Sequence, residues 1–166
     1  DVHGVAPRSA TDPFRREAEA WLPVVSGYDA DMLRLGLTGY FKTFRAPQLR
    51  RFVAEDFANP AVLDGFQPAP KGGAVRAFGP DLLVHVWAGN VPALSLWSLV
   101  CGLLVKAPGI GKLASAEPLF AGWFARLLAE VHPPLADCLA VVWWRGAGGE
   151  DVDALYAQAD TVLAYG

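Results

Sequence analysis

The chain has 166 residues, of which 53% are hydrophobic and 19% are charged. Enough apolar residues are present for a packed core, so the composition excludes an intrinsically disordered chain. The formal net charge is −3 and no long basic run occurs, so we expect no nucleic acid partner.

Helical patterns fill the first part of the chain. Aspartate or asparagine caps a helix well and proline fits its first turn, so such pairs indicate helix starts. Helices are predicted to start at Asp12 and Pro13, to run from about 31 to 44, and to start again at Pro47 and at Asn59 and Pro60. We therefore expect residues 1–70 to form an N-terminal helical segment.

The pattern changes after a turn rich in proline and glycine at 68–73. Beyond it, apolar runs of strand length alternate with helical stretches. The predicted strands are 74–78, 82–87, 110–114, 139–144 and 161–164, and the predicted helices are 93–105, 118–131 and 150–158. Such alternation implies parallel strands with right-handed crossovers, and strands without polar alternation imply that both sheet faces are covered. Residues 71–166 are thus predicted to form part of a doubly wound α/β domain, incomplete at its C-terminal end.

The apolar segment 82–105 is long enough to resemble a membrane span. However, His85, a turn at Gly89 and Asn90, and Pro92 divide it into a strand and a helix. A spanning helix needs about twenty uninterrupted apolar residues. We therefore predict no membrane span.

The two ends of the chain and its cysteines bear on where the protein works. The chain starts at Asp1 without a signal-peptide pattern and ends at Gly166 on an apolar, strand-like run. We expect a piece of a longer, cytoplasmic protein. Cys101 and Cys138 have no metal-ligand spacing, so both are predicted to be small buried hydrophobes and no metal site is expected.

Several motifs that resemble functional ones have simpler interpretations. The segment 108–112 is similar to a phosphate-binding loop, but Lys106 stands where that motif needs glycine and Leu113 where it needs serine or threonine. The glycine-rich loop at 146–149 is interpreted as a turn. His85, within a predicted strand, is interpreted as a core or interface residue with a satisfied hydrogen bond. The two tryptophans of the third long strand, Trp143 and Trp144, are interpreted as packing residues.

Two polar residues lie near the carboxyl ends of predicted parallel strands, at the edge where open α/β sheets bind ligands. Asn90 comes after the strand 82–87, and its amide can donate a hydrogen bond to a developing oxyanion. The alternative is an asparagine that simply tolerates turn geometry. Lys112 lies in the strand 110–114, where a cation can bind ribose hydroxyls or a 2′-phosphate; the alternative is a solvated surface lysine.

The order of these motifs resembles the aldehyde dehydrogenase superfamily, and within it the fatty-acyl-CoA reductases of the bacterial luminescence type, the LuxC family. The resemblance covers about residues 74 to 166. It rests on HVWAGNVP at 85–92, GLLVK at 102–106, KLASAEP at 112–118, VVWW at 141–144 and ADTVLAYG at 159–166. It implies a Rossmann-like sheet of the aldehyde dehydrogenase type and a partial nucleotide-binding domain at 71–166.

The resemblance also implies roles for individual residues. Asn90 corresponds to the family's oxyanion-hole asparagine and Lys112 to the lysine that holds the adenosine ribose. Ser115 stands where NAD-preferring relatives often carry an acidic residue, and a neutral serine favours NADPH. Glu117, two residues on, keeps NADH possible. The family's nucleophilic cysteine is expected downstream of Gly166, since neither cysteine of the chain matches its motif.

The first functional hypothesis is therefore a fragment of an NADPH-dependent reductase. It would convert a fatty acyl-CoA, or another acyl thioester, to an aldehyde through a cysteine acyl-enzyme. Without that cysteine, the chain alone is expected to be inactive. Two alternatives stay open, namely a non-catalytic truncated relative that associates with other chains, including copies of itself as a homo-oligomer, and an NAD-dependent aldehyde dehydrogenase.

Overall fold

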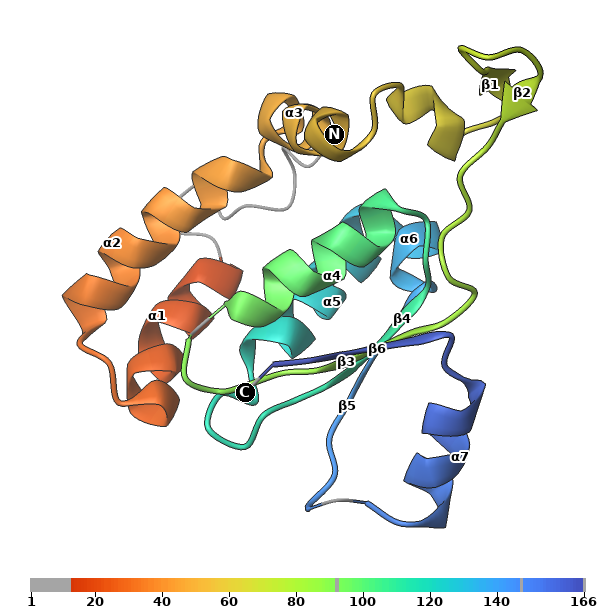
Figure 1. The fold of residues 1–166 in the computed structure, drawn as a ribbon. Coiled ribbons are helices and arrows are strands. Elements are labelled where there is room, and N and C mark those ends of the chain that lie inside the picture. The colour runs from red at the N-terminus through yellow and green to blue at the C-terminus, as the bar shows by residue number, and fades with distance from the viewer. Residues whose placement is uncertain (1–12, 92, 147, 166) are drawn as a thin grey trace.

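The computed structural model describes residues 13–91, 93–146 and 148–165, so the predicted cap at Asp12 lies outside the described residues. Helices dominate the first half and a parallel sheet the second (Figure 1). In chain order the elements are α1 (Pro13–Ser26), α2 (Ala30–Tyr40), the 3-10 helix η2 (Phe41–Phe44), α3 (Ala46–Asp56), the 3-10 helix η3 (Pro60–Leu63), β1 (Gln67–Pro68), β2 (Ala74–Val75), β3 (Leu83–Val86), α4 (Leu94–Leu104), β4 (Gly109–Lys112), α5 (Phe120–Val131), α6 (Pro133–Ala136), β5 (Leu139–Val142), α7 (Glu150–Gln158) and β6 (Thr161–Ala164).

Side-chain caps start two of the N-terminal helices, and the cap at Asn59 was predicted, whereas α3 begins after Arg45 without a side-chain cap. The Asp29 carboxylate accepts hydrogen bonds from the first backbone N–H groups of α2, and the Asn59 side chain caps η3 by accepting from Ala61. The single helix predicted over 31–44 is wrong, because α2 gives way at Phe41 to the tighter η2. Glycines at 36 and 39 weaken the α-helix just before this change.

The turn predicted at 68–73 joins two very short antiparallel strands, β1 and β2. The strand predicted over 74–78 is therefore limited to its first two residues. Similarly, α5 begins at Phe120 rather than at 118, and the short α6 that follows it was not predicted.

The main sheet has the order β5-β4-β3-β6, and all its strands are parallel, which confirms the α/β prediction. From β3 the chain moves outward to β4 and β5, then returns to the other side of β3 as β6. The strand order thus reverses between β3 and β6. Figure 1 shows α4 and α5 on one face of the sheet and α7 on the other.

The expectation that both sheet faces are fully covered holds only at the centre. Leu83, Val84 and His85 of β3 are buried, whereas every residue of β6 is exposed. Strand β6 is an edge strand, and its unpaired side has no neighbouring strand among the described residues.

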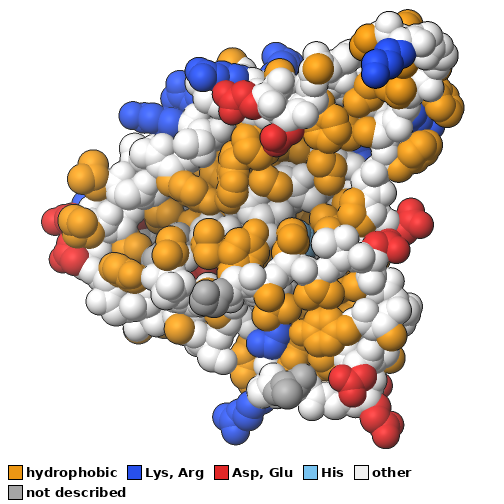
Figure 2. Space-filling model, viewed as in Figure 1, with side chains coloured by type: hydrophobic (Ala, Val, Ile, Leu, Met, Phe, Trp, Pro, Cys, Tyr) orange, Lys and Arg blue, Asp and Glu red, His pale blue; other side chains and the backbone are white. Residues whose placement is uncertain are grey.

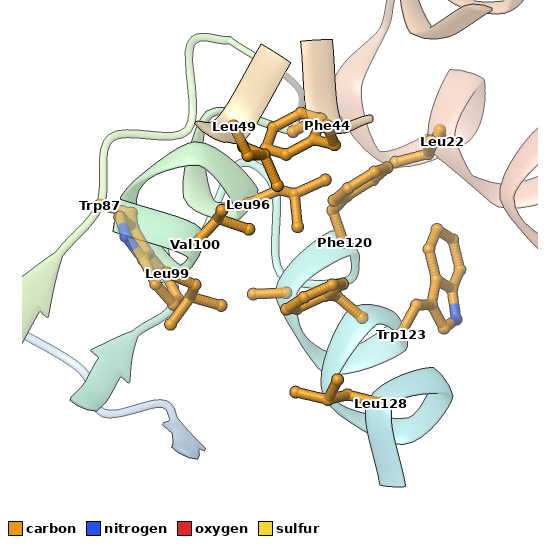
Figure 3. Packing of buried hydrophobic residues seen from close by; sticks show 13 residues of the cluster. Leu22, Phe44, Leu49, Trp87, Leu96, Leu99, Val100, Phe120, Trp123 and Leu128 are labelled. Atoms are coloured by element: carbon orange, nitrogen blue, oxygen red, sulfur yellow. The ribbon is translucent and has the colours of Figure 1, made fainter. Parts of the chain in front are cut away.

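One hydrophobic core joins the two halves of the chain. Leu22 and Phe44 of the N-terminal helices pack with Leu99 of α4 and Phe120 of α5 (Figure 3). The Phe41 ring stacks on Phe120 with 6.0 Å between ring centroids. The N-terminal helices therefore form part of the scaffold that supports the carboxyl end of the sheet.

The cysteine predictions need correction. Cys138 is exposed, because it lies in the connection between α6 and β5 rather than within the strand. Cys101, on α4, is only half-buried. Within the described part of the chain, no helix combines the length and apolar character needed to cross a membrane.

Candidate functional site

Strands β3, β4 and β6 end on the same edge of the sheet, beside the point where the strand order reverses. Val86, the last residue of β3, is in register with Lys112 of β4 and with Ala164 of β6. The carboxyl ends of these strands are therefore level. This is the edge where open α/β sheets bind ligands, and the predicted site residues lie at the end of β4 and on the loops after β3 and β4.

The loop after β3 holds Asn90 on the surface, with a strained backbone directly behind it. Asn90 is exposed. Ala93, which precedes the first residue of α4, is fully buried and has φ of 68°, in the left-handed region that residues other than glycine rarely adopt. Such a conformation persists only where the surrounding structure holds it.

Two tyrosines of the N-terminal helical segment hold this loop. The Tyr28 hydroxyl donates a hydrogen bond to the backbone oxygen of Asn90 at 2.9 Å. The Tyr40 hydroxyl donates to the backbone oxygen of Ala93 at 3.0 Å. Burial raises the pKa of Tyr40 to about 12, so this hydroxyl stays a donor at neutral pH. Sequence reasoning missed both residues, since no motif marks a tyrosine whose partner lies more than fifty residues away.

Lys112 reaches across the sheet edge toward the loop after β5. It is half-buried, and its ammonium lies 5.4 Å from the centroid of the Trp144 ring, a favourable cation–π distance. Strand β5 ends before both tryptophans, so the interpretation of the pair as packing within a strand is corrected. Trp143 is 53% exposed, and Trp144 packs edge-on against Tyr156 of α7.

The loop between β4 and α5 carries the other two predicted residues in different environments. The Ser115 side chain is exposed. Glu117 is only 6% exposed, and its carboxylate accepts hydrogen bonds from the backbone N–H groups of Leu119 and Phe120 at 3.0 and 2.8 Å. Burial raises the pKa of Glu117, and these two hydrogen bonds oppose the shift. Glu117 thus caps α5, and its role toward a cofactor stays a prediction.

The structure brings the loops of Asn90 and Ser115 together through a glycine. A Cβ atom added to Gly89 would lie 2.7 Å from the Cβ of Ala116 and 3.1 Å from that of Ala114. Only glycine therefore permits this approach of the two loops. Lys112, by contrast, directs its ammonium toward Trp144.

Beneath this edge, a buried polar chain links β3, α4 and the residue after β6. His85 is fully buried, and its Nδ1 lies 2.6 Å from the Ser98 hydroxyl oxygen, which also accepts a hydrogen bond from the Tyr165 hydroxyl. Burial lowers the pKa of His85, so the ring is held neutral. The prediction of a satisfied core histidine is confirmed at Nδ1 alone, because Nε2 has no partner among the described residues.

The fold and this edge define an α/β protein with a parallel sheet, supported by N-terminal helices, with polar loops where its strand order reverses. A family model described as acyl-CoA reductase (LuxC) matches residues 2–166. The chain therefore belongs to the LuxC family of acyl-CoA reductases.

Curated relatives agree with this assignment at low identity. The chain is 29% identical to a long-chain acyl-protein thioester reductase of Photorhabdus luminescens, over 69% of this chain and 24% of the relative. It is 30% identical to the Vibrio harveyi protein of the same name, over 55% of this chain and 20% of the relative. It is 28% identical to the Aliivibrio fischeri protein, over 92% of this chain and 32% of the relative. The matched regions span between a fifth and a third of the length of these relatives.

Proposed function

We propose that the protein carrying this chain reduces a long-chain acyl thioester to an aldehyde with NADPH, through a cysteine acyl-enzyme. The observation that carries this proposal is the exposed Asn90, on a loop held by Tyr28 and Tyr40 at the carboxyl end of β3. Family membership and the names of the relatives support reduction of an acyl group. The acyl donor is a protein thioester in those names, and coenzyme A is the other donor of the same chemistry.

The polar groups after β4 fit a phosphorylated dinucleotide. The order β5-β4-β3-β6 matches the 3-2-1-4 part of the dinucleotide-binding sheet, which supports a Rossmann-like fold of the aldehyde dehydrogenase type. Lys112 offers ammonium donors to ribose hydroxyls or a 2′-phosphate, and the exposed Ser115 adds a neutral hydroxyl. Glu117 directs its carboxylate to α5, which favours NADPH over NADH. When bound, NADPH supplies the hydride.

Neither cysteine of the chain stands where the reaction would take place. Cys138 lies just before β5, at the amino end of the sheet, opposite to Asn90. Cys101 lies near the end of α4, and burial raises the pKa of its thiol, which disfavours the nucleophilic thiolate. The proposed nucleophile is therefore a cysteine outside these 166 residues.

The proposed task of Asn90 is to stabilise charge on the substrate oxygen. Attack of the cysteine thiolate on the thioester carbonyl forms a new C–S bond and moves an electron pair onto that oxygen. When the oxyanion collapses, the original C–S bond breaks and the donor leaves as its thiolate, which takes up a proton from water. The Asn90 amide donates a hydrogen bond to the oxyanion, and Tyr28 and Tyr40 hold its loop in place before the charge develops.

The test is a single-turnover measurement of aldehyde formation from a long-chain acyl thioester by the complete protein. Asn90→Ala is expected to slow this step by roughly 10²–10³-fold while leaving NADPH affinity unchanged. Asn59→Ala is the matched control, because Asn59 caps η3 in the N-terminal segment. An unchanged rate in Asn90→Ala would make Asn90 a turn residue and remove the main support of the proposal.

A further inference from the structure

We propose that the cavity between the N-terminal helices and α4 and α5 binds a long-chain fatty acid as its carboxylate anion. This is a site separate from the carboxyl edge of the sheet. The choice of a long alkyl chain rests on the proposed function, whereas the cavity and its charges stand on the structure alone.

The cavity has a volume of about 400 Å³, within the range of small-molecule sites. Side chains from α1, α2, η2, α4 and α5 line it, and most of them are apolar. The apolar lining includes Leu22, Leu37, Phe41, Phe120, Trp123 and Phe124. Figure 3 shows Leu22, Phe120 and Trp123 gathered in this region. Such a lining provides few hydrogen-bond partners, so it suits an unbranched alkyl chain.

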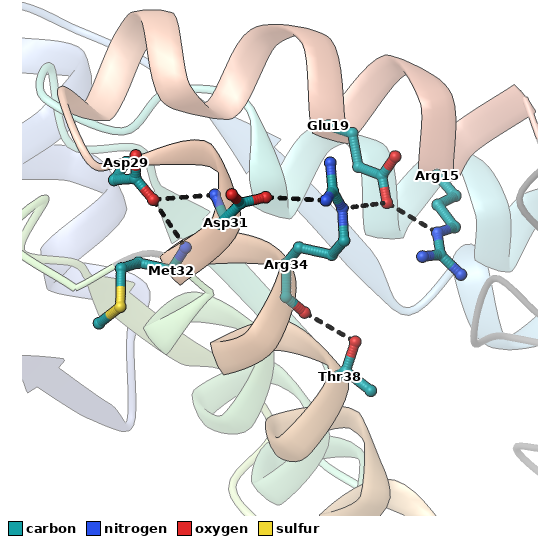
Figure 4. A network of polar contacts seen from close by, with 7 residues as sticks. All are labelled: Arg15, Glu19, Asp29, Asp31, Met32, Arg34 and Thr38. Carbon is teal, nitrogen blue, oxygen red and sulfur yellow. Dashed lines mark hydrogen bonds and ion pairs between the residues drawn. The ribbon is translucent and has the colours of Figure 1, made fainter.

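Basic side chains predominate among the charged residues of the lining. One is acidic, Glu19, and four are basic, namely Arg15, Arg34, Lys42 and Arg45. Glu19 pairs with Arg15 at 2.8 Å and with Arg34 at 3.6 Å (Figure 4). The hydrogen bond from Arg15 holds the pKa of Glu19 below its ordinary value, so this carboxylate stays charged and compensated.

Lys42 and Arg45 provide the head-group site. Both are exposed, and neither has a carboxylate within ion-pair distance in the described part of the chain. Figure 2 shows hydrophobic side chains in a band between α2 and α4, with basic side chains along the edge beyond it. An apolar cavity with cations at its rim matches an amphiphile with an anionic head.

The cavity wall continues into the connection between α1 and α2, which contacts the loop of Asn90 through Tyr28. Pro23 and Ala30 line the cavity, and the chain between them carries Tyr28, whose hydroxyl binds the backbone oxygen of Asn90. The proposed alkyl chain would therefore lie against residues on either side of the connection that carries Tyr28.

The test is an equilibrium titration of the complete protein with mid-chain brominated hexadecanoate, below its micelle concentration, followed by quenching of tryptophan fluorescence. Saturable quenching is expected, and Trp123→Phe should remove most of it because Trp123 lines the cavity. Each methylene added between octanoate and hexadecanoate should raise the affinity about fourfold until the cavity is filled. Ala18→Trp, which fills part of the cavity, should weaken binding at least tenfold.

A charge test separates the head-group site from simple hydrophobic binding. Lys42→Gln with Arg45→Gln should weaken hexadecanoate about tenfold and leave hexadecanol unaffected. The matched control is Arg50→Gln with Lys71→Gln, which removes the same charge from exposed positions outside the cavity. Equal affinities of both double variants for hexadecanoate would overturn the proposal.

Two other outcomes have definite meanings. Binding that appears only after removal of residues 1–12 would assign the cavity to the chain's own N-terminal segment and overturn the fatty acid site. Aldehyde formation without saturable quenching would overturn this inference and leave the proposed function intact. Saturable, charge-dependent binding without aldehyde formation would support the cavity site and count against the proposed function.

Discussion

The hydroxyl of Tyr28 donates a hydrogen bond to the backbone oxygen of Asn90 across 62 positions of sequence, with 2.9 Å between the two oxygens. This contact ties the N-terminal helical segment to the loop after β3. We expect Tyr28→Phe to lower kcat for acyl thioester reduction about fivefold with little change in KM, because a hydrogen bond of about 1 kcal/mol that positions Asn90 is lost.

The control for Tyr28→Phe is Tyr156→Phe, which removes a hydroxyl without a hydrogen-bond partner among the described residues. A raised KM with normal kcat in Tyr28→Phe would show that the tyrosine serves substrate binding rather than the position of Asn90.

Lys112 is predicted to bind the cofactor. Lys112→Ala in the complete protein should weaken NADPH at least tenfold, since a charge-assisted contact contributes about 1.5–3 kcal/mol. The measurement is a fluorescence titration with NADPH and NADH, with Lys71→Ala as a control at an exposed turn. If Lys112 serves only to pack on Trp144, affinity for both cofactors will be unchanged while thermal stability falls.

Ser115 is predicted to set the cofactor preference. Ser115→Glu places a carboxylate on the exposed surface after β4, where it would repel a 2′-phosphate and accept hydrogen bonds from ribose hydroxyls. The ratio of kcat/KM for NADPH to kcat/KM for NADH should fall at least tenfold. A tenfold fall corresponds to a change of about 1.4 kcal/mol in the difference between the activation free energies with the two cofactors. A wild-type protein that already prefers NADH would contradict the assignment.

Local patterns predicted the sheet well because its strands lie in short, largely apolar runs that alternate with helical patterns. The positions of β3, β4, β5 and β6 agree with prediction to within one or two residues. Their parallel direction follows from the alternation with helices. The order of the strands could not be predicted from this alternation, because it is set by pairing between segments far apart in the chain, such as Leu83 with Thr161.

Candidate site residues could be named from the sequence, but their environments could not. The capping role of Glu117 depends on where α5 begins, two residues later than predicted. The direction of Lys112 depends on Trp144, thirty-two positions away in the chain. Cys138 was placed in the core because an apolar run follows it, yet α6 ends just before it and leaves it exposed.

The Glu117 cap is expected to contribute to stability. Glu117→Ala should lower the free energy of unfolding by about 1 kcal/mol, because two backbone N–H groups at the start of α5 lose their acceptor. Glu117→Gln keeps an acceptor oxygen and should retain most of that stability. Urea titrations of the three proteins at neutral pH give the comparison, and equal losses in both variants would rule out capping as the cause.

The same carboxyl makes a prediction about pH. Burial raises the pKa of Glu117 above its ordinary value of 4.5, so the protonated carboxyl adds stability below that value beyond what the cap contributes. Only this addition is lost as the pH rises through the raised pKa. Glu117→Gln cannot titrate, so its free energy of unfolding should fall less than that of the wild type over this range. A profile parallel to that of the wild type would show that the carboxyl titrates as it does in the unfolded chain.

His85 makes the opposite prediction on the acid side of neutrality. Burial lowers its pKa below the ordinary value of 6.5, so the unfolded chain takes up a proton before the folded protein does. Stability from the neutral ring is therefore full above pH 6.5 and is lost as the pH falls through the lowered pKa. His85→Gln should flatten the fall in the free energy of unfolding below that pH, although its value at neutral pH will be lower because the contact with Ser98 is altered. Chemical denaturation at a series of pH values measures both effects, and an acid slope as steep in the variant as in the wild type would assign the proton uptake to another group.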